Sequence, residues 1–500
     1  MPLNINVSKY IVNMHYIKLN PQYIVRNEKK CSYIVKLEQQ IEKGTQRING
    51  NVFVIPPVVG FIISEIGKDT STSSIIKISS SLGVATDKVG YFINNLIGKK
   101  ECKFVFGGHT FFVPPHILIN SDTKDNRKYY SDIKFSPFGH FENKRPSVPF
   151  NVSIMVTTAC HTNCIYCYAK RDNVNSLQLE KIENIIDECR KIGVANVALT
   201  GGDIFCKKDW KKLFAYVVDR EYYPFLSTKM PLTEYEVSFL REIGLNKLQF
   251  SIDSVDMNIL QIMIGCSSSY IQKVRQMFVF CQQHNIRLNI RSVITAHNGT
   301  VENFKQLYAF LSQFENILDW VITPAFYSEF KMGYKDYTPN NEQLASVSIF
   351  VKSLTSKFPV FLNKINRCGY QLNRFKTVEE FVMNNQICHA GNYMLSILPT
   401  GICTPCEMLY DNPDFILGNI NEFPLQTIWN STKALDICTS RQIGNSETSS
   451  PCKKCAVLEV CRKSIDRRVC LVDISKTLGK GYSDYPDPRC PKSTVTGYIL

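Results

Sequence analysis

Three cysteines within a short stretch of the chain have the spacing of metal ligands. They are Cys160, Cys164 and Cys167 in "TTACHTNCIYCYAKR" (157–171), and the aromatic residue Tyr166 stands directly before the last of them. A tetrahedral zinc ion and an iron–sulfur cubane held by protein both take four ligands, so this set is one ligand short. The spacing alone leaves zinc and iron–sulfur open, and it predicts a centre whose remaining ligand comes from elsewhere.

A second group of cysteines lies between residues 368 and 490, where Cys452, Cys455 and Cys461 repeat the close spacing. The opening "MPLNINVSKYIV" lacks the basic start and the cleavage site of a secretory signal, so the protein is expected in the cytoplasm. Because the cytosol keeps thiols reduced, the 19 cysteines favour metal ligation over a disulfide framework. The scattered cysteines are expected to be buried thiols: Cys31, Cys102, Cys189 and Cys281.

The composition is typical of a globular chain. With 44% hydrophobic and 20% charged side chains, the 500 residues can form about two to four domains. No apolar run reaches the roughly 18 residues of a membrane helix. The formal net charge of +14 indicates an acidic partner, a description that nucleic acid, an anionic membrane surface and an acidic peptide all fit.

A short β-rich run followed by a helical pattern recurs between residues 150 and 325. In the first helical stretch, "LQLEKIENIIDECRKIG" (177–193), apolar residues recur about every 3.6 positions. Such units in a row predict parallel strands with right-handed crossovers, and a partial (β/α)6 barrel of the TIM type is the expected α/β fold. The expected strands are 152–158, 196–201, 225–230, 247–253, 288–295 and 319–325.

The groups that could do chemistry follow the ends of these strands. The cysteine triplet follows the first strand, Gly201, Gly202 and Asp203 follow the second, and Ser251 and Asp253 end the fourth. Because the active site of such a barrel lies at the carboxyl ends of its strands, we expect these groups to converge on one rim.

The regions on either side of the barrel have different patterns. Short β-rich pieces, an apolar helix near 57–67 and helical patterns at 72–82 and 86–98 predict a winged helix–turn–helix near the N-terminus. Beyond about residue 350 periodicity fades and cysteine rises, as expected where metal clusters replace an apolar core. The expected domains are a recognition domain at 1–110, a linker at 111–149, the barrel at 150–350, a bridging region at 351–387, a cysteine-rich domain at 388–490 and a tail at 491–500.

The motif Cys160-x3-Cys164-x2-Cys167 with Tyr166 resembles the signature of the radical S-adenosylmethionine (SAM) superfamily. In that family three cysteines hold a four-iron cluster, and the amino and carboxylate groups of SAM chelate the fourth iron. The resemblance therefore implies that the missing ligand is the cosubstrate. One electron from the cluster cleaves SAM to methionine and a 5′-deoxyadenosyl radical, which abstracts hydrogen.

The same resemblance implies SAM contacts for several of the strand-end residues. Gly201, Gly202 and Asp203 match the Gly-Gly-Glu element of the family, and the "FSID" strand end that contains Ser251 and Asp253 matches its "SLDG". Alone, "GGD" is only a strand-to-helix turn with an N-cap aspartate. Arg291 is expected either to reach the SAM carboxylate or to be a solvated strand arginine.

Cys388, Gly401 and Cys406, followed by Cys452-x2-Cys455-x5-Cys461 and Cys490, resemble the SPASM extension of peptide-modifying radical SAM enzymes. The two resemblances together cover roughly residues 150–490. They imply SAM and three four-iron clusters (4Fe–4S): one that binds SAM and two auxiliary ones. The implied ligands are Cys452, Cys455, Cys461 and Cys490 for the distal auxiliary cluster, and Cys388, Cys406 and Cys470 for the nearer one.

The chain departs from the SPASM pattern at Ile465, where the family has a cysteine. The fourth ligand of the nearer cluster is therefore open between Cys403, Cys368 and a substrate thiolate. Glu407 follows Cys406 where sulfatase-maturing relatives have a catalytic aspartate, and it is expected to be either a base or an exposed glutamate.

The N-terminal pattern resembles the PqqD-like recognition element that is fused to many maturases of ribosomally made peptides. Such elements bind the leader of a precursor peptide as an added β-strand. The resemblance implies a maturase that installs crosslinks in a precursor peptide, with thioethers from peptide cysteines as the first expectation. An electron donor such as flavodoxin or ferredoxin is the other expected partner, whereas no nucleic acid or membrane is expected.

Other activities fit the same motifs. Carbon–carbon crosslinking, epimerisation and sulfatase-type oxidation are the enzyme alternatives, and an iron–sulfur sensor that binds DNA through the winged helix is the alternative from another class. Against DNA binding, residues 61–100 hold five lysines, three acids and no arginine, the side chain best suited to bidentate base contacts.

Overall fold

The chain folds into two compact units, one holding the described residues up to Phe150 and the other those from Asn151 onward. The computed structural model describes residues 16–37, 52–68, 72–121, 129–167, 169, 176–325, 334–363, 375–410, 412–439, 449–479 and 481–494. Cys368, one possible ligand of the nearer cluster, lies outside these residues.

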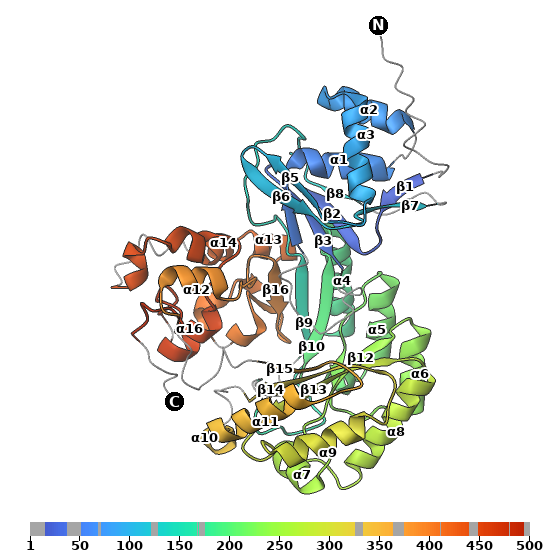
Figure 1. Cartoon of the computed structure of the whole chain (residues 1–500), viewed down its shortest axis with the longest axis vertical. Coiled ribbons are helices and arrows are strands. Elements are labelled where there is room, and N and C mark those ends of the chain that lie inside the picture. The colour runs from blue at the N-terminus through green and yellow to red at the C-terminus, as the bar shows by residue number, and fades with distance from the viewer. Residues whose placement is uncertain are drawn as a thin grey trace. The chain divides into compact units, whose positions relative to one another are not determined.

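The first unit combines short strands with three helices, as the sequence predicts (Figure 1). Its apolar core includes Val25, Ile34, Ile63 and Ile93, which come from strands and helices alike. The helices are α1 (Pro57–Lys68), α2 (Thr72–Leu82) and α3 (Thr86–Ile97). The strands are β1 (Tyr16–Leu19), β2 (Tyr23–Asn27), β3 (Ser32–Lys36), β4 (Val52–Ile55), β5 (Cys102–Phe106), β6 (His109–Val113), β7 (Leu118–Ser121) and β8 (Tyr130–Ser131).

The main sheet of this unit has the strand order β4-β3-β2-β8, so β4 and β8 are its edges among the described strands. The segment 111–149, expected as a linker, instead supplies β7, which pairs with β1, and β8, which pairs with β2. The sequence did not predict these two short strands, because they depend on partners that lie about a hundred residues earlier in the chain. The assignment of this unit as a winged helix and recognition element stays a prediction.

The second unit begins with the parallel strands that the sequence predicts. They are β9 (Asn151–Thr157), β10 (Asn196–Gly201), β11 (Ser227–Thr228), β12 (Lys247–Ser251), β13 (Arg287–Ile294), β14 (Ile317–Pro324) and the unpredicted β15 (Val360–Leu362). All neighbouring pairs among them are parallel.

These strands form two sheets and not one continuous barrel wall. One sheet has the order β11-β12-β13-β14-β15, and the other has the order β10-β9-β16-β17-β18. No strand pairing joins β10 to β11 among the described residues. The second sheet includes β16 (Met394–Ile397), which runs parallel to β9, so the cysteine-rich segment is built directly onto the barrel strands.

Helices between the strands cover the outer face of the sheets (Figure 1). In α4 (Leu179–Ile192) the buried residues Ile182, Ile185, Ile186 and Cys189 confirm the predicted 3.6-residue period. The other helices are α5 (Trp210–Asp219), α6 (Glu234–Glu242), α7 (Met257–Ile264), α8 (Tyr270–Gln283), α9 (Val301–Leu311), α10 (Tyr334–Tyr337) and α11 (Asn341–Ser353), with a 3-10 turn η4 (Ile204–Cys206).

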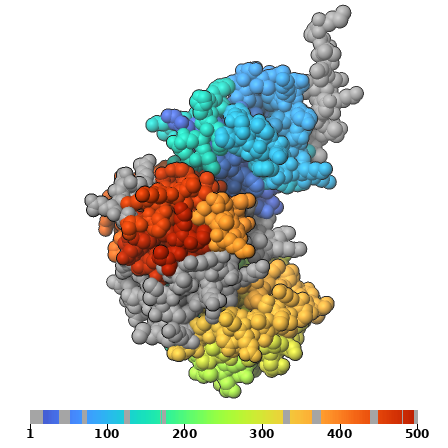
Figure 2. All heavy atoms as spheres, turned by 60° about the vertical axis from the view of Figure 1, so that its left-hand side comes forward, coloured from blue at the N-terminus to red at the C-terminus, as the bar shows by residue number. Residues whose placement is uncertain are grey.

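The C-terminal part is built from short elements, and its described residues gather into one continuous body of the surface (Figure 2). A small core of Phe381, Val469, Ile474 and Cys490 holds α12 (Val378–Asn384) against α16 (Leu471–Leu478). The remaining elements are β17 (Ile402–Thr404), η5 (Glu407–Leu409), η6 (Pro413–Phe415), β18 (Gly418–Asn419), α13 (Leu425–Trp429), α14 (Thr432–Thr439), η7 (Pro451–Lys454) and the π-helix η8 (Glu459–Lys463). None of the helices in the described ranges combines the length and apolar character that a membrane crossing needs.

Candidate functional site

The cysteine triplet lies on the loop that follows β9. Cys164 is buried, whereas Cys160 and Cys167 are half-buried. The hydroxyl of Thr162 lies 3.7 Å from the Cys160 Sγ and 3.3 Å from the Cys164 Sγ, a contact to both thiols that the sequence analysis missed. The end of α7 anchors this loop. The backbone N–H groups of Asn163 and Ile165 donate to the carbonyls of Ile264 and Met263.

The "GGD" element at the end of β10 packs its backbone against this loop. The N–H of Gly202 donates to the Thr157 carbonyl at 2.9 Å, and the N–H of Asp203 donates to the Ala159 carbonyl at 2.7 Å. A Cβ atom on Gly202 would lie 2.1 Å from the Ala159 oxygen, and one on Gly201 would lie 2.3 Å from the Thr157 oxygen. Only glycine allows this close approach, so the two glycines set the position of the residue before Cys160.

The carboxylate of Asp203 accepts three hydrogen bonds from protein groups. Its Oδ1 accepts from the Phe205 N–H and caps η4, as the simpler interpretation of "GGD" predicts. Its Oδ2 accepts from the Thr228 hydroxyl at 2.7 Å and from the Lys229 N–H at 3.1 Å. Asp203 therefore links β10 to β11 where no strand pairing joins the two sheets.

Lys229, which the sequence analysis did not single out, joins the separate motifs. Its Nζ donates to the Asp253 Oδ2 at 2.8 Å, and both side chains are largely buried. The Tyr166 hydroxyl donates to the same carboxylate oxygen, while the Val293 N–H donates to the Asp253 Oδ1 at 2.8 Å. Through its backbone to Asp203 and its side chain to Asp253, Lys229 connects the elements after β10, β11 and β12.

Electrostatics at this junction involve the cysteines directly. Burial raises the pKa of Cys164, and the Lys229 ammonium opposes that shift. Burial, followed by the charge of Asp253, raises the pKa of Tyr166 well above its usual value, so its phenol keeps the proton that it donates. Desolvation lowers the pKa of Lys229, but Asp253 and the Cys164 and Cys160 thiols outweigh it and raise that pKa above its usual value. The charge of Lys229 therefore interacts with two of the three candidate ligands.

Polar side chains in register on β11, β12, β13 and β14 bond to one another across the strands and form a polar lining on one face of the sheet. The Gln249 Nε2 donates to the hydroxyls of Ser227 and Ser251, at 2.8 and 2.9 Å. The Asn289 Nδ2 donates to the Asp319 Oδ1 at 3.0 Å. The interior of a TIM barrel is usually filled by branched apolar residues, so this polar lining is suited to a polar substrate.

Arg291 belongs to this lining and does not extend free into the site. Its Nη1 forms an ion pair with the Asp319 Oδ1 at 2.6 Å, and the Asp319 carboxylate is almost fully buried. The expectation of a solvated arginine is wrong, since the guanidinium pairs with a buried acid, whereas a contact with the SAM carboxylate stays a prediction.

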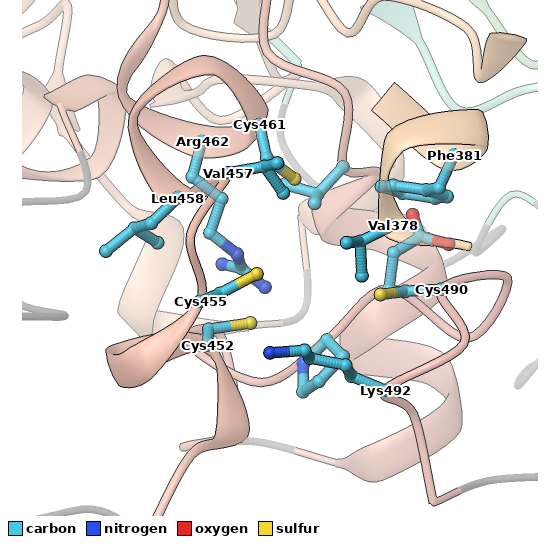
Figure 3. Close-up of a pocket in the computed structure, with 13 residues that line it drawn as sticks. Val378, Phe381, Cys452, Cys455, Val457, Leu458, Cys461, Arg462, Cys490 and Lys492 are labelled. Atoms are coloured by element: carbon cyan, nitrogen blue, oxygen red, sulfur yellow. The ribbon is translucent and has the colours of Figure 1, made fainter. Parts of the chain in front are cut away.

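The four cysteines expected at the distal auxiliary cluster line one pocket (Figure 3). Cys452 lies in η7, Cys455 follows it directly, Cys461 lies in η8 and Cys490 in the C-terminal loop. Apolar side chains such as Val378 and Phe381 also line the pocket. Arg462, almost fully buried, also lines the pocket and donates through Nη1 to the Ser483 carbonyl at 2.8 Å.

This pocket has the donor set of a four-iron cluster, because such clusters are held by four thiolates. Burial raises the pKa of Cys461 to about 12 and that of Cys490 to about 11, so without metal these thiols stay protonated. Binding of iron would deprotonate them and release protons, and the Arg462 guanidinium would offset part of the resulting negative charge. In the part of the chain that the structure describes, no three His, Cys, Asp or Glu side chains surround a single-ion site.

The ligands expected for the nearer auxiliary cluster lie on neighbouring segments. Cys406 and Cys470 pack against the same small group of apolar residues. The Cys388 N–H donates to the Arg467 carbonyl at 2.7 Å, which brings Cys388 to the segment that leads to Cys470. Ile465, at the position where the SPASM family has a cysteine, is buried. Glu407 opens η5 directly after Cys406 and is half-buried.

Two further thiols bear on the fourth ligand of this cluster. Cys403 lies on β17 in the main apolar core, and burial raises the pKa of its thiol to about 12. Cys438, which the sequence analysis did not consider, is buried on α14 and donates through Sγ to the Gly391 carbonyl at 2.7 Å. A Cβ on Gly391 would meet the Cys438 Sγ at 3.0 Å and Pro405 at 3.4 Å, so this thiol lies beside the segments that carry Cys388 and Cys406.

Comparison with known families separates the two thiol-rich regions. Residues 154–311 match the radical SAM superfamily, and residues 388–456 match the SPASM iron–sulfur cluster-binding domain. The PqqA peptide cyclase of Granulibacter bethesdensis is 22% identical over 357 residues, which cover 69% of this chain and 88% of that protein.

Solved structures share the fold over nearly the whole chain. Streptococcus suis SuiB bound to S-adenosylmethionine superposes with a TM-score of 0.59 at 14% identity, covering 94% of this chain and 98% of SuiB. SuiB bound to its precursor peptide SuiA gives a TM-score of 0.60 at 14% identity, covering 96% and 100%. The chain thus combines a radical SAM domain, which carries the cysteine triplet, with a SPASM iron–sulfur domain.

Proposed function

We propose that this chain is a radical SAM maturase that installs crosslinks in a ribosomally made precursor peptide. The observation that carries the proposal is the presence of two unlike thiol sets in one compact unit. An incomplete set of three lies above a polar barrel lining, and a complete set of four lies in an enclosed pocket. The similarity to a peptide cyclase and to SuiB supports a peptide as the substrate.

The residues of the first set would prepare the site for SAM. A four-iron cluster held by Cys160, Cys164 and Cys167 would supply the electron that cleaves SAM to a 5′-deoxyadenosyl radical. Thr162 contacts two of these thiols, and the Lys229 ammonium, which Asp253 holds in place, opposes the rise in the pKa of Cys164. A cation near thiolate ligands stabilises the reduced cluster, which carries one more negative charge.

The polar lining below would hold the peptide. Hydroxyls and amides of Ser251, Gln249 and Asn289 offer hydrogen-bond partners to a peptide backbone, which apolar barrel residues do not. Leader recognition would use the edge strand β4 of the first unit, because edge strands can accept an added peptide strand.

The bond that we propose is a thioether between a peptide cysteine and an acceptor carbon. Loss of the cysteine at position 465 leaves Cys388, Cys406 and Cys470 as three ligands of the nearer cluster, and a substrate thiolate would be the fourth. The radical takes a hydrogen atom from the acceptor carbon, the thiol loses its proton, and the S–C bond forms. The remaining electron passes to the auxiliary cluster.

Carbon–carbon crosslinking is the second candidate, and Cys438 favours it. If this thiol ligates the nearer cluster, no coordination position is left there for a substrate thiolate. Mass spectrometry with alkylation separates the two reactions. Both lower the peptide mass by about 2 Da for each ring, but a thioether also makes the peptide cysteine unreactive to iodoacetamide. A lighter peptide with fully alkylatable cysteines would rule out the thioether.

Leader recognition is tested by comparing the full chain with a protein that begins at Asn151, the first residue of the second unit. We expect a labelled leader peptide to bind the full chain and to lose at least tenfold in affinity for the shorter protein. SAM cleavage should stay within about twofold, because the thiol triplet and Lys229 belong to the second unit. Equal leader affinity would assign another role to the first unit.

A further inference from the structure

A basic hollow lies at the start of α5, on the segment that follows η4. It is lined by Lys207, Lys208, Lys211, Lys212 and Trp210, with Gln178, Asp209 and Glu236 at its margin. The hollow therefore contains four lysines and only two carboxylates, so its side chains carry an excess of positive charge. Lys208 and Lys212 are exposed, whereas the Lys207 Nζ lies 3.3 Å from Asp209 and the Lys211 Nζ lies 3.9 Å from the centre of the Tyr235 ring.

The position of these lysines on α5 disfavours them electrostatically. Lys211 and Lys212 occupy the first turn of this ten-residue helix, and Lys207 and Lys208 precede it. A helix N-terminus carries a partial positive charge. Each cation near it therefore destabilises the helix by about 0.3–1 kcal/mol. The helix end and the lysines therefore both attract an anionic partner. The two carboxylates of the hollow offset only part of the lysine charge.

A short chain of backbone contacts connects the hollow to the first cysteine. The Trp210 N–H donates to the Lys207 carbonyl, and the Lys207 N–H donates to the Ile204 carbonyl. Ile204 follows Asp203, whose N–H donates to the carbonyl of Ala159, the neighbour of Cys160. Cys206, one residue before the hollow, has its pKa raised to about 11 by burial, then by the charges of Asp203 and Cys160.

We propose that this hollow is the docking surface for an acidic one-electron carrier protein that reduces the cluster held by Cys160, Cys164 and Cys167. The proposal rests on the proposed function, since SAM cleavage consumes one electron for each turnover. The carrier is oxidised by one electron as the cluster is reduced by one. Electron transfer slows steeply with distance. A carrier bound in the hollow would lie beside Cys206, whose pKa responds to the charge of the cluster ligand Cys160.

Charge and location both favour this occupant over the precursor peptide. Transient electron-transfer complexes have small interfaces, and complementary charge raises their association rate. A peptide held in the hollow would lie at the start of α5, one of the helices that follow the strands (Figure 1), and not at the polar lining where we propose hydrogen abstraction.

The test uses the reconstituted full chain, with an acidic bacterial flavodoxin in its hydroquinone form as the probe. Lys208→Glu/Lys212→Glu reverses the two exposed charges of the hollow. Lys273→Glu/Lys305→Glu makes the same change in net charge at two exposed lysines on α8 and α9. The rate of cluster reduction is followed as bleaching of the iron–sulfur absorbance, at low and at high salt.

We expect flavodoxin to reduce the hollow variant at least tenfold more slowly than the control variant at low ionic strength. The two rates should converge at high salt, because screening removes steering between exposed charges. Dithionite should reduce both variants at the same rate, which shows that the fold and cluster are intact.

Equal flavodoxin rates for the two variants would overturn the proposal. So would a loss of precursor affinity in the hollow variant without slower reduction, since the hollow would then hold the peptide. Failure of the unmodified chain to cleave SAM with dithionite would instead overturn the proposed function. Slower flavodoxin reduction of the hollow variant alone would still support docking in that case, because bleaching does not require SAM.

Discussion

The two thiol-rich regions of the second unit differ in completeness and in surroundings. The loop after β9 offers three cysteines beside a lysine cation and above polar side chains. The pocket of Cys452, Cys455, Cys461 and Cys490 offers four, and apolar side chains, a buried arginine, Asp487 and the exposed Lys492 line it with them. Metal sites that act on a substrate keep a coordination position open, whereas structural sites are closed. This difference is the basis of our proposal that substrate chemistry takes place at the first region and that the second would hold a cluster without an open position for substrate.

The largest expected effect comes from removing the open thiol set. Cys160→Ala/Cys164→Ala/Cys167→Ala should abolish reductive SAM cleavage and remove about four of about twelve irons, because all ligands of one cluster are lost. Iron analysis and product chromatography measure both. The matched control, Cys31→Ala/Cys189→Ala/Cys281→Ala, changes three buried thiols outside both sets and should keep iron and activity. Cleavage by the first variant would refute the assignment.

A smaller but still large effect is expected at Lys229. Lys229→Met leaves the Asp253 carboxylate buried without its cation, so we expect unfolding to become easier by about 3 kcal/mol. We also expect SAM cleavage to slow at least tenfold. In Lys229→Met/Asp253→Asn the stranded charge is gone, and most of the stability should return while cleavage stays slow. Thermal unfolding and cleavage assays on the same samples check this. A single variant as stable as the unmodified protein would show that the pair does not stabilise the rim.

Removing the four cysteines of the pocket should have the smallest effect on SAM cleavage. Cys452→Ala/Cys455→Ala/Cys461→Ala/Cys490→Ala should also lose about four irons, yet SAM cleavage should fall by no more than about threefold. Peptide crosslinking should fall much further, since its remaining electron needs an acceptor. Complete loss of SAM cleavage in soluble, folded protein would remove the functional distinction between the two regions.

The sequence predicted the strands of the barrel well because their patterns are local. The expected run at 196–201 coincides with β10, and the run at 152–158 differs from β9 by one residue at each end. By contrast, the run at 225–230 contains only the two residues of β11, and β16 was not predicted. Both depend on partners distant in the chain: Asp203 accepts from Thr228 at the end of β11, and β16 pairs with β9.

The candidate ligands could be chosen from spacing, but the residues around them could not. Nothing local distinguishes Lys229 from the other lysines, and its role appears only when β11 and β12 bring it to Asp253. Arg462 follows a ligand cysteine and would be taken for a surface cation, yet it is almost fully buried. For Asp203 the motif match implies a SAM contact, which stays a prediction, but the motif gave no sign that the carboxylate also joins two sheets.

Mössbauer spectroscopy of iron-57-enriched protein, with and without SAM, tests the contrast between the regions most directly. If the first region is open and the second closed, SAM should shift the signal of a single iron in the cluster of Cys160, Cys164 and Cys167. The cluster of the enclosed pocket should not change, and the triple cysteine variant should show no response to SAM. A SAM-induced shift that persists in the triple variant, or no shift in the unmodified protein, would contradict the account.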